Sequence, residues 1–201
     1  MGKTLLDLSK ERRSVRRYTD ENVFLDDILY ALKVASLAPS GANEQPWRFV
    51  IVEDDNTKKL VREACERGER HLYDNVKGEF KKWLLSQGLS HEKPFLEEAP
   101  YLVVVLMKRS AKYARESVWV AIGYILLALE EKGLSTLAYT PSNTDYPLHE
   151  LDAPTGFKLE AILPVGHSDD ESPRTSRREL SETVFMNKWG NLIPCARATG
   201  S

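Results

Sequence analysis

The sequence predicts a single α+β domain in which a mostly antiparallel or mixed sheet is flanked by helices. The chain has 201 residues, 42% of them hydrophobic and 29% charged, which suits one globular domain with a sizeable core. Strand-like and helix-like segments follow one another, and no repeat, linker or low-complexity tract divides them. Residues 101–107 are apolar on both faces, as in a central strand.

The first half of the chain contains helical patterns and one strand. We expect helices over the three segments with helical spacing or capping residues: 5–12, 26–37 and 57–67. Gly68 is the expected stop of the third helix. Residues 47–53 are rich in strand formers, and the charged stretch 71–88 is expected to be a surface excursion with one or two helices.

The second half of the chain contains a long apolar helix and further strands. Residues 117–132 form a helix that is apolar almost all round, with Gly133 as its C-cap. Two strands are expected over 135–140 and 158–165, and a short run at 183–186 follows. Because one domain of this size seldom encloses a helix on every side, the apolar helix predicts an obligate homodimer.

The overall charge and the cysteine content exclude several classes of partner. The formal net charge is −2 and the isoelectric point is near 6.1, which indicates neither a nucleic acid partner nor an anionic membrane surface. Cys65 and Cys195 are too isolated for a disulfide framework or a zinc site, so a reducing cytoplasm is expected. The longest apolar run, 118–129, is too short to span a bilayer, and no signal-peptide pattern is visible. Residues 197–201 are interpreted as a tail or a cloning remnant.

A cluster of arginines near the N-terminus is a candidate phosphate site. Residues 12–17 have the sequence RRSVRR, which places several guanidinium groups beside a hydroxyl. Guanidinium groups donate two parallel hydrogen bonds to phosphate, although a solvated basic face is an equally good interpretation of the pattern alone. Arg177 and Arg178 form a second basic pair far along the chain, and their convergence on the same phosphate is a hypothesis.

The sequence offers no metal centre and no protein nucleophile. The four histidines are scattered without ligand spacing, and there is no Gly-x-Ser-x-Gly motif, P-loop or dinucleotide fingerprint. A redox reaction would therefore require a bound cofactor.

Three separated motifs resemble the FMN-dependent nitroreductase superfamily in order and spacing. They are RRSVR at 12–16, PSGANEQPW at 39–47 and LPVGH at 163–167, the last followed by Arg177 and Arg178. Within that superfamily the motifs PSGANEQPWRFVIV, FLEEAPYLVVVLMK, TPSN and LPVGH are most similar to the iodotyrosine deiodinase branch. Since these motifs cover nearly the whole chain, residues 1–196 are expected to form one nitroreductase-like domain.

The resemblance implies an intertwined homodimer with two FMN sites, each built from both chains at the interface. The phosphate and ribityl chain would be bound by one chain, and the flavin ring would also be approached by the partner. The residues implied at FMN are Arg12, Arg13, Ser14 and Arg177 at the phosphate and ribityl chain with Arg16 close by, Pro39, Ser40 and Gly41 from the partner subunit, and Thr140.

Two residues are implied at the reacting atoms. Thr140, just before Pro141, matches the position whose hydroxyl and amide face flavin N5 in deiodinases, and a hydroxyl donor there favours one-electron steps. The alternative is an ordinary strand-end residue before a proline. The amide N–H of Ala42 is implied to donate to the phenolate oxygen of a substrate over the flavin, and Gly41 would let the backbone come close to that flat ring.

The charged excursion matches an inserted active-site lid, here residues 69–95. The resemblance implies that Glu69, Tyr73 and Lys93 clamp the amino and carboxylate groups of a halogenated tyrosine. The trio suits a zwitterion, because it combines an anion, a hydroxyl donor and a cation. Two alternatives stay open: the three are ordinary residues of a charged helix and loop, or Glu66 takes the acidic role.

The implied function is reductive dehalogenation of halotyrosines, with electrons passing from reduced FMN to a stacked halophenol. One alternative is a broad NAD(P)H nitroreductase or quinone reductase, and another is a flavin-binding protein without a substrate of its own. The electron donor is expected to be NAD(P)H or a separate reductase. The expected partners are thus a halogenated tyrosine or related phenol and a second copy of the chain.

Overall fold

The computed structural model describes residues 2–86, 88–171 and 174–192. The chain divides into two compact units, Met1–Asp170 and Glu171–Ser201, and the first contains the sheet and its core. The tail 197–201 and Cys195 lie outside the described residues. Within the described part, no helix combines the length and the apolar character needed to cross a membrane.

The centre of the first unit is an antiparallel sheet. Its strands are β1 (Trp47–Val52), β2 (Tyr101–Lys108), β3 (Ser135–Thr136) and β4 (Phe157–Gly166), in the spatial order β1-β2-β4-β3. β2 is central, as its apolar sequence predicts, and Val103 lies opposite Ile51 on one side and Leu163 on the other. The expectation of an antiparallel sheet flanked by helices is confirmed.

β3 is shorter than the predicted strand 135–140. It pairs with β4 at Ser135 and Thr136, and after a gap Tyr139 makes an isolated bridge with Ile162. Pairing does not continue beyond this bridge, because Pro141 has no N–H to donate to a neighbouring strand. The 139–143 segment therefore leaves the sheet while Tyr139 stays attached to it.

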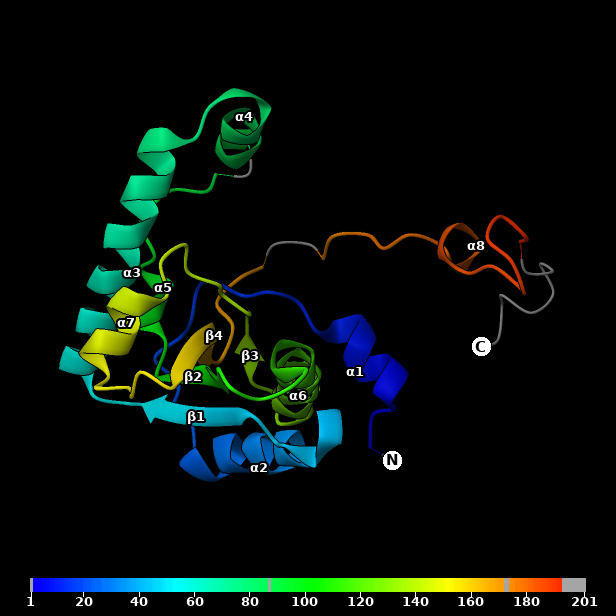
Figure 1. Cartoon of the computed structure of the whole chain (residues 1–201), viewed down its shortest axis with the longest axis horizontal. Helices are drawn as coiled ribbons and strands as arrows, with labels where there is room; N and C mark the ends of the chain where they lie inside the picture. The colour runs from blue at the N-terminus through cyan, green and yellow to red at the C-terminus, as the bar shows by residue number, and fades with distance from the viewer. Residues whose placement is uncertain (1, 87, 172–173, 193–201) are drawn as a thin grey trace. The chain divides into compact units, whose positions relative to one another are not determined.

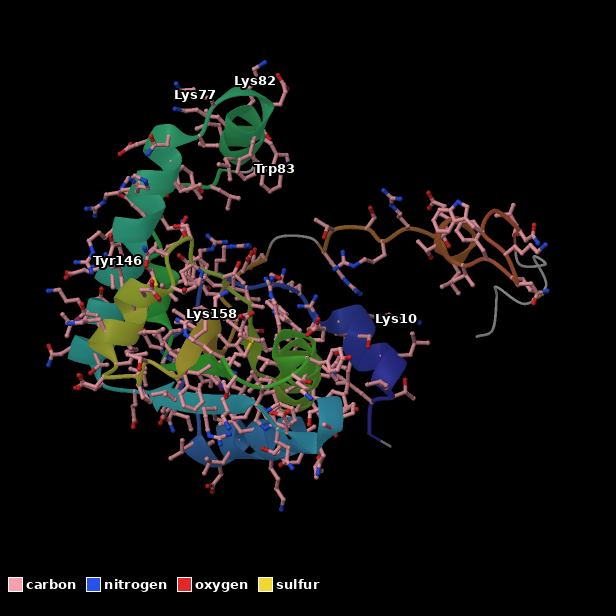
Figure 2. The ribbon with its side chains drawn as sticks, viewed as in Figure 1. Lys10, Lys77, Lys82, Trp83, Tyr146 and Lys158 are labelled. Atoms are coloured by element: carbon pink, nitrogen blue, oxygen red, sulfur yellow. The ribbon has the colours of Figure 1, made fainter. Side chains whose placement is uncertain are left out.

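Helices cover both faces of the sheet (Figure 1). One face carries α2 (Leu25–Ser36) and α6 (Ala114–Glu131), and α1 (Leu5–Glu11) packs on α6. The helices on the other face are α3 (Asp55–Asn75), α5 (Phe95–Glu98) and α7 (Asp145–Glu150). α7 is fastened to α3 by Arg67, whose guanidinium lies 4.2 Å from the ring centroid of Tyr146, labelled in Figure 2.

The apolar run of β2 supplies two hydrophobic cores. Val103 and Val105 pack with α2 and α6, whereas Leu102 and Val104 pack with α3 and α5. Successive side chains of a strand point to opposite faces, so a strand covered on both sides is apolar throughout.

α3 continues past Gly68. The prediction that the helix ends at this glycine is therefore wrong. Gly68 is not among the left-handed glycines, and the helix ends at Asn75. A Cβ atom at position 68 would lie only 2.7 Å from Cβ of Asn143. The glycine therefore permits a close crossing between α3 and the 139–143 segment, and its role is packing, not capping.

The charged excursion after α3 contains the helix α4 (Gly78–Ser86). Gly78, its first residue, and Gly88, which follows its end, have left-handed backbone at φ +68° and +63°. No residue of α4 belongs to either hydrophobic core, and within this helix Leu84 alone is buried. Figure 1 shows α4 beyond the C-terminal end of α3, apart from the sheet, and Figure 2 shows Trp83 on it.

The second unit contains the helix α8 (Leu180–Thr183) and a bridge between Phe185 and Leu192. The ring centroids of Phe185 and Trp189 lie 4.6 Å apart. The short run predicted at 183–186 therefore corresponds to the end of a helix and the start of this bridge.

Candidate active site

A cavity of about 550 Å³ lies between the end of α3, α4 and the segment that follows β3. Apolar side chains form part of its wall, including Phe80 and Leu84 of α4 and Phe95 of α5. Five of the polar residues in the wall were predicted as site residues from separate parts of the sequence: Arg16, Glu69, Tyr73, Lys93 and Thr140. Ser90, Glu92 and Tyr139 also line the cavity and were not predicted as site residues. The fold thus brings the three expected lid residues to the same cavity as Thr140.

Glu69 is a buried acid in the cavity wall. Its Oε1 atom accepts a hydrogen bond from the Tyr139 hydroxyl (2.7 Å) and another from the backbone N–H of Ser142 (3.0 Å). Both donors belong to the segment that α3 crosses closely at Gly68. Burial, and then the nearby Cys65 and Glu69, raise the pKa of Tyr139 far above its ordinary value, so the hydroxyl keeps the proton that it donates.

Glu66, one turn earlier on α3, is occupied by structural bonds. Its Oε1 accepts the backbone N–H of Lys93 (2.8 Å), and its Oε2 accepts from the Arg62 guanidinium (2.9 Å). Arg62 in turn donates to Glu97 (2.6 Å). Glu66 does not line the cavity, whereas Glu69 does. The geometry therefore distinguishes the two acids: Glu66 fastens the Lys93 backbone to α3, and Glu69 faces the cavity.

Lys93 is a buried cation in the same cavity. Its ammonium donates to the carbonyl oxygen of Ser90 and lies 5.3 Å from the ring centroid of Tyr73. Burial lowers the pKa of Lys93, and the nearby Glu69 and Glu66 partly offset this effect. A partly desolvated ammonium of this kind binds an incoming carboxylate more strongly than an exposed lysine does.

Tyr73 and α4 form the remaining wall of the cavity on the lid side. Burial raises the pKa of Tyr73, with a smaller contribution from Glu69, so its hydroxyl is a donor near neutral pH. Phe80 lines the cavity and stacks on Trp83 of the same helix, with ring centroids 5.9 Å apart. The wall thus combines polar groups at the end of α3 with apolar surface on α4.

The arginine cluster follows α1 and runs beside β3. Arg12 is the C-cap of α1, and Ser14 forms a bridge with Thr136 of β3. Arg13 donates to the Ser168 hydroxyl (3.3 Å), and Arg16 reaches the cavity wall. Ser14 and Arg16 are both exposed, and Arg16 lines the cavity whereas Ser14 does not.

Arg177 belongs to the second unit. Within that unit its guanidinium donates to the carbonyl and hydroxyl oxygens of Thr175 (3.0 and 3.1 Å) and to the carbonyl of Ser176 (3.3 Å). Its expected role at a phosphate stays a prediction.

The turn 39–45 is strained and does not line the cavity. Ala42, Asn43 and Gln45 all have left-handed backbone, with φ of 50°, 55° and 45°. For alanine this conformation costs about 1 kcal/mol. Ala42 is exposed, and its N–H makes no hydrogen bond in the part of the chain that the structure describes.

The turn is held by hydrogen bonds among its own residues and by one bond to α6. The Ser40 hydroxyl accepts the N–H of Gln45 (3.0 Å), and the side-chain amide of Gln45 donates to that of Asn43 (3.3 Å). Gly41 donates its N–H to the Ser117 hydroxyl (3.1 Å), and a Cβ at this position would lie 2.8 Å from the Tyr113 ring of the same chain. Within this chain, the ring that Gly41 allows to come close is therefore that of Tyr113.

Sequence reasoning missed the two donors that hold Glu69. The sequence predicts Tyr139 as part of a strand, and Ser142 belongs to the TPSN motif. The available signal was the alternation of Leu137 and Tyr139, which puts both side chains on the face covered by α3. The sequence does not show which acid accepts the Tyr139 hydrogen bond, because that depends on α3 continuing past Gly68 to place Glu69 beside Tyr139.

Residues 9–167 match the Nitroreductase family. The chain belongs to this family. Among the curated relatives of this nitroreductase-family protein, iodotyrosine deiodinase of Thermotoga neapolitana is 51% identical over 178 residues, covering 89% of this chain and 96% of the relative. Iodotyrosine deiodinase 1 of Homo sapiens is 33% identical over 194 residues, covering 89% of this chain and 66% of the relative.

Solved structures agree with this family membership. A crystal structure of oxidized iodotyrosine deiodinase bound to FMN and 3-iodo-L-tyrosine is similar to this nitroreductase-family protein with a TM-score of 0.84 and 50% identity, covering 88% of this chain and 96% of that one. An FMN-dependent nitroreductase from Clostridium difficile R20291 has a TM-score of 0.73 at 23% identity, covering 92% and 99%, and therefore shares the fold.

Proposed function

We propose that this protein is an FMN-dependent reductive dehalogenase of halogenated tyrosines. The observation that carries the proposal is the convergence of Glu69, Tyr73 and Lys93 on one cavity. An amino acid presents an ammonium and a carboxylate together, and the cavity offers a buried acid and a buried amine, one for each. The 51% identity to an iodotyrosine deiodinase supports the same conclusion.

Each of the three residues has a distinct part in binding. Glu69 accepts hydrogen bonds from the substrate ammonium, and Lys93 pairs with the substrate carboxylate. Tyr73 adds a hydroxyl donor, while Phe80 and Leu84 cover the phenol ring and exclude water. Enclosure strengthens both charge pairs, because the cavity has a lower effective dielectric than water.

We further propose that Arg12, Arg13, Ser14, Arg16 and Arg177 bind the phosphate and ribityl chain of FMN, and that Thr140 lies at its reactive edge. The donors fit this group, because guanidinium groups and a hydroxyl bind phosphate, and Arg16 of this cluster lines the cavity. Reduced FMN, when bound, would supply the two electrons that, with one proton, convert the carbon–halogen bond to a carbon–hydrogen bond and release halide. The protein then has to hold the phenol against the flavin and donate hydrogen bonds to its oxygen.

We propose that the site is completed by a second copy of the chain. Pro39, Ser40, Gly41 and Ala42 do not line this chain's own cavity, and the strained Ala42 exposes an unbonded N–H. The surface near α1 and α6 is apolar, with a groove of about 420 Å³. In a homodimer these surfaces cover one another, and the Ala42 N–H of the partner subunit donates to the substrate phenolate.

The lid is proposed to be residues 69–95, within one nitroreductase-like domain of residues 1–196. This range begins at Glu69, contains α4 and ends at Phe95, and all three contribute to the cavity wall. α4 adds nothing to either hydrophobic core, so its apolar residues are available to cover a ligand.

Cys65 is a buried free thiol, which is compatible with the proposal of a cytoplasmic protein.

The test is anaerobic turnover of 3-iodotyrosine by the FMN-loaded protein reduced with dithionite, with released iodide as the readout. We expect stoichiometric iodide release, and we expect Glu69→Gln and Lys93→Ala each to raise KM for iodotyrosine about tenfold or more, since each removes a charged partner. Reduction of a nitroaromatic that carries neither charge should be unaffected. Equal losses on both substrates, or no iodide from the wild type, would refute the assignment.

A broad nitroreductase or quinone reductase is the second candidate, favoured by the match of residues 9–167 to the family as a whole. In that case the lid residues are incidental, and the two variants above lose nothing specific to iodotyrosine. Oxidation of NADH or NADPH by the purified protein identifies the electron donor, since a protein that depends on a separate reductase oxidises neither.

A further inference from the structure

We propose that Tyr139 is a positioning residue that holds the Glu69 carboxylate in its binding orientation and away from Lys93. The inference rests on the proposed function, because it assigns a task to a residue that supports the clamp. The Tyr139 hydroxyl donates to Glu69 Oε1 at 2.7 Å, and both side chains are buried. The bond joins the sheet to the lid side of the cavity.

Tyr139 is a rigid support. Its backbone N–H donates to the carbonyl of Ile162 (3.0 Å), and its own carbonyl accepts the N–H of Ile162 (2.8 Å). Its ring packs edge-on against Phe95, with centroids 5.6 Å apart. A hydroxyl fixed at both backbone and ring has little freedom left, so it defines where its acceptor must lie.

The two donors to Glu69 occupy the same oxygen. Tyr139 and the Ser142 N–H both bond to Oε1, which leaves Oε2 without either bond. A carboxylate held by one oxygen cannot rotate freely, and its second oxygen stays directed to one place. An ammonium group that enters the cavity then meets an acceptor that is already oriented.

Lys93 explains why such a restraint is needed. It lines the same cavity as Glu69, and the charge of Glu69 raises the pKa of Lys93 in opposition to burial, so the two groups interact through space. Yet none of the ion pairs found among the described residues joins them, and the Lys93 ammonium bonds to Ser90 instead. If Glu69 were free to turn, the two charges would neutralise each other, and a zwitterion would have to break that pair before binding.

The test compares Tyr139→Phe with Tyr101→Phe in the FMN-loaded protein. Tyr101 is a matched control, because it is equally buried and its hydroxyl donates to a carboxylate, Glu53, at 2.8 Å, but it does not line the cavity. We expect Tyr139→Phe to raise KM for 3-iodotyrosine about tenfold, with kcat at saturation unchanged. Activity on 2-iodophenol, which lacks both charges, should not change. Tyr101→Phe should change neither the KM for 3-iodotyrosine nor the activity on 2-iodophenol.

A second pair of variants separates positioning from general loss of structure. Placing 4-aminophenylalanine at position 139 retains a donor on the ring and should restore the KM for iodotyrosine. In a Glu69→Ala background, Tyr139→Phe should have no further effect, because it acts through that carboxylate.

Each outcome bears on a definite claim. An unchanged KM in Tyr139→Phe, an equal loss on 2-iodophenol, or additive effects with Glu69→Ala would overturn the role of Tyr139 while leaving dehalogenation intact. A wild-type protein that releases no iodide from either substrate would overturn the proposed function itself, and this inference with it. If Tyr139→Phe does not fold, failure of the 4-aminophenylalanine protein to keep the wild-type KM decides against the proposal.

Discussion

At the scale of single residues, the cavity keeps one acid and one amine buried but separate. A buried charge is costly unless it is bonded, and here each has its own neutral partners: Tyr139 and Ser142 for Glu69, and Ser90 for Lys93. Neutral partners stabilise a charge without cancelling it. A zwitterionic ligand would supply the two counter-charges together, and we therefore expect the site to prefer an amino acid over a simple phenol.

The lowered pKa of Lys93 predicts how binding depends on pH. Because burial favours the neutral amine, the side chain loses its proton below the ordinary value of 10.5, and the attraction for a carboxylate is lost as pH rises through the lowered pKa. We expect KM for 3-iodotyrosine to rise on the alkaline side, and Lys93→Arg, which stays charged, to move that rise to higher pH.

The measurement is KM against pH for both proteins, with 2-iodophenol as a control for titration of the phenol itself. Identical rises in KM on the alkaline side for the wild type and Lys93→Arg would contradict the pairing of Lys93 with the substrate carboxylate.

The lowered pKa of Lys93 also makes the free energy of unfolding depend on pH, and the direction follows from the shift. Between the lowered pKa and 10.5 the unfolded chain binds more protons than the folded one, so the free energy of unfolding rises with pH in that window.

The site residues were predictable to the extent that they lie in local motifs. Glu69, Tyr73 and Lys93 were expected from the family resemblance and not from their spacing alone, and the structure puts all three on one cavity. The choice between Glu69 and Glu66 did not follow, because two acids one turn apart are equivalent in sequence. Their donors decide between them, and those donors come from residues distant in the chain.

At the scale of elements, the crossing of α3 over the 139–143 segment organises the cavity. The same helix contributes Glu69 and Tyr73, and Glu66 on it accepts the backbone N–H of Lys93, so the course of α3 beyond the sheet determines where these polar groups lie. The close approach at Gly68 brings Ser142 and Tyr139 within bonding distance of Glu69. A structural glycine therefore controls the geometry of a binding acid.

Gly68→Ala tests this dependence. Alanine is favoured over glycine inside a helix by about 1 kcal/mol, so propensity alone would stabilise the protein. The new Cβ would lie 2.7 Å from Cβ of Asn143 and has to push the 139–143 segment away. We expect a lower thermal midpoint together with a raised KM for 3-iodotyrosine, measured by calorimetry and by iodide release. A higher midpoint with unchanged KM would show that the crossing is not restrictive.

The elements themselves were predictable where their pattern was strong. The apolar run of β2 and the periodic helices α2 and α6 were expected within a few residues of their observed bounds. The end of α3 was not, because glycine is a common helix stop and nothing near Gly68 in sequence reveals the segment packed against it. The predicted length of β3 was too great, because residues that favour strands continue after the chain has left the sheet.

At the scale of the whole molecule, apolar surface is left over. Several large side chains of α1, α2 and α6 remain exposed, including Leu5 at 66%, Val120 at 41% and Tyr124 at 40%. α6 is apolar almost all round, and a single chain does not cover it. Contiguous surface of this kind indicates a protein interface, and together with the unbonded Ala42 N–H it favours the proposed dimer.

Gly123 is the position at which the dimer is best tested. It lies on α6 between Val120 and Tyr124, and among the residues that the structure describes no atom from outside the helix approaches a Cβ at this position within 4 Å. A leucine is therefore accommodated in the isolated subunit, whereas a closely packed partner would be displaced. We expect Gly123→Leu to be monomeric by light scattering, to retain its helical circular dichroism and to lose FMN on gel filtration. Lys59→Leu, on the exposed side of α3, should stay dimeric, and a Gly123→Leu protein that keeps both its dimeric mass and its FMN would place the interface elsewhere.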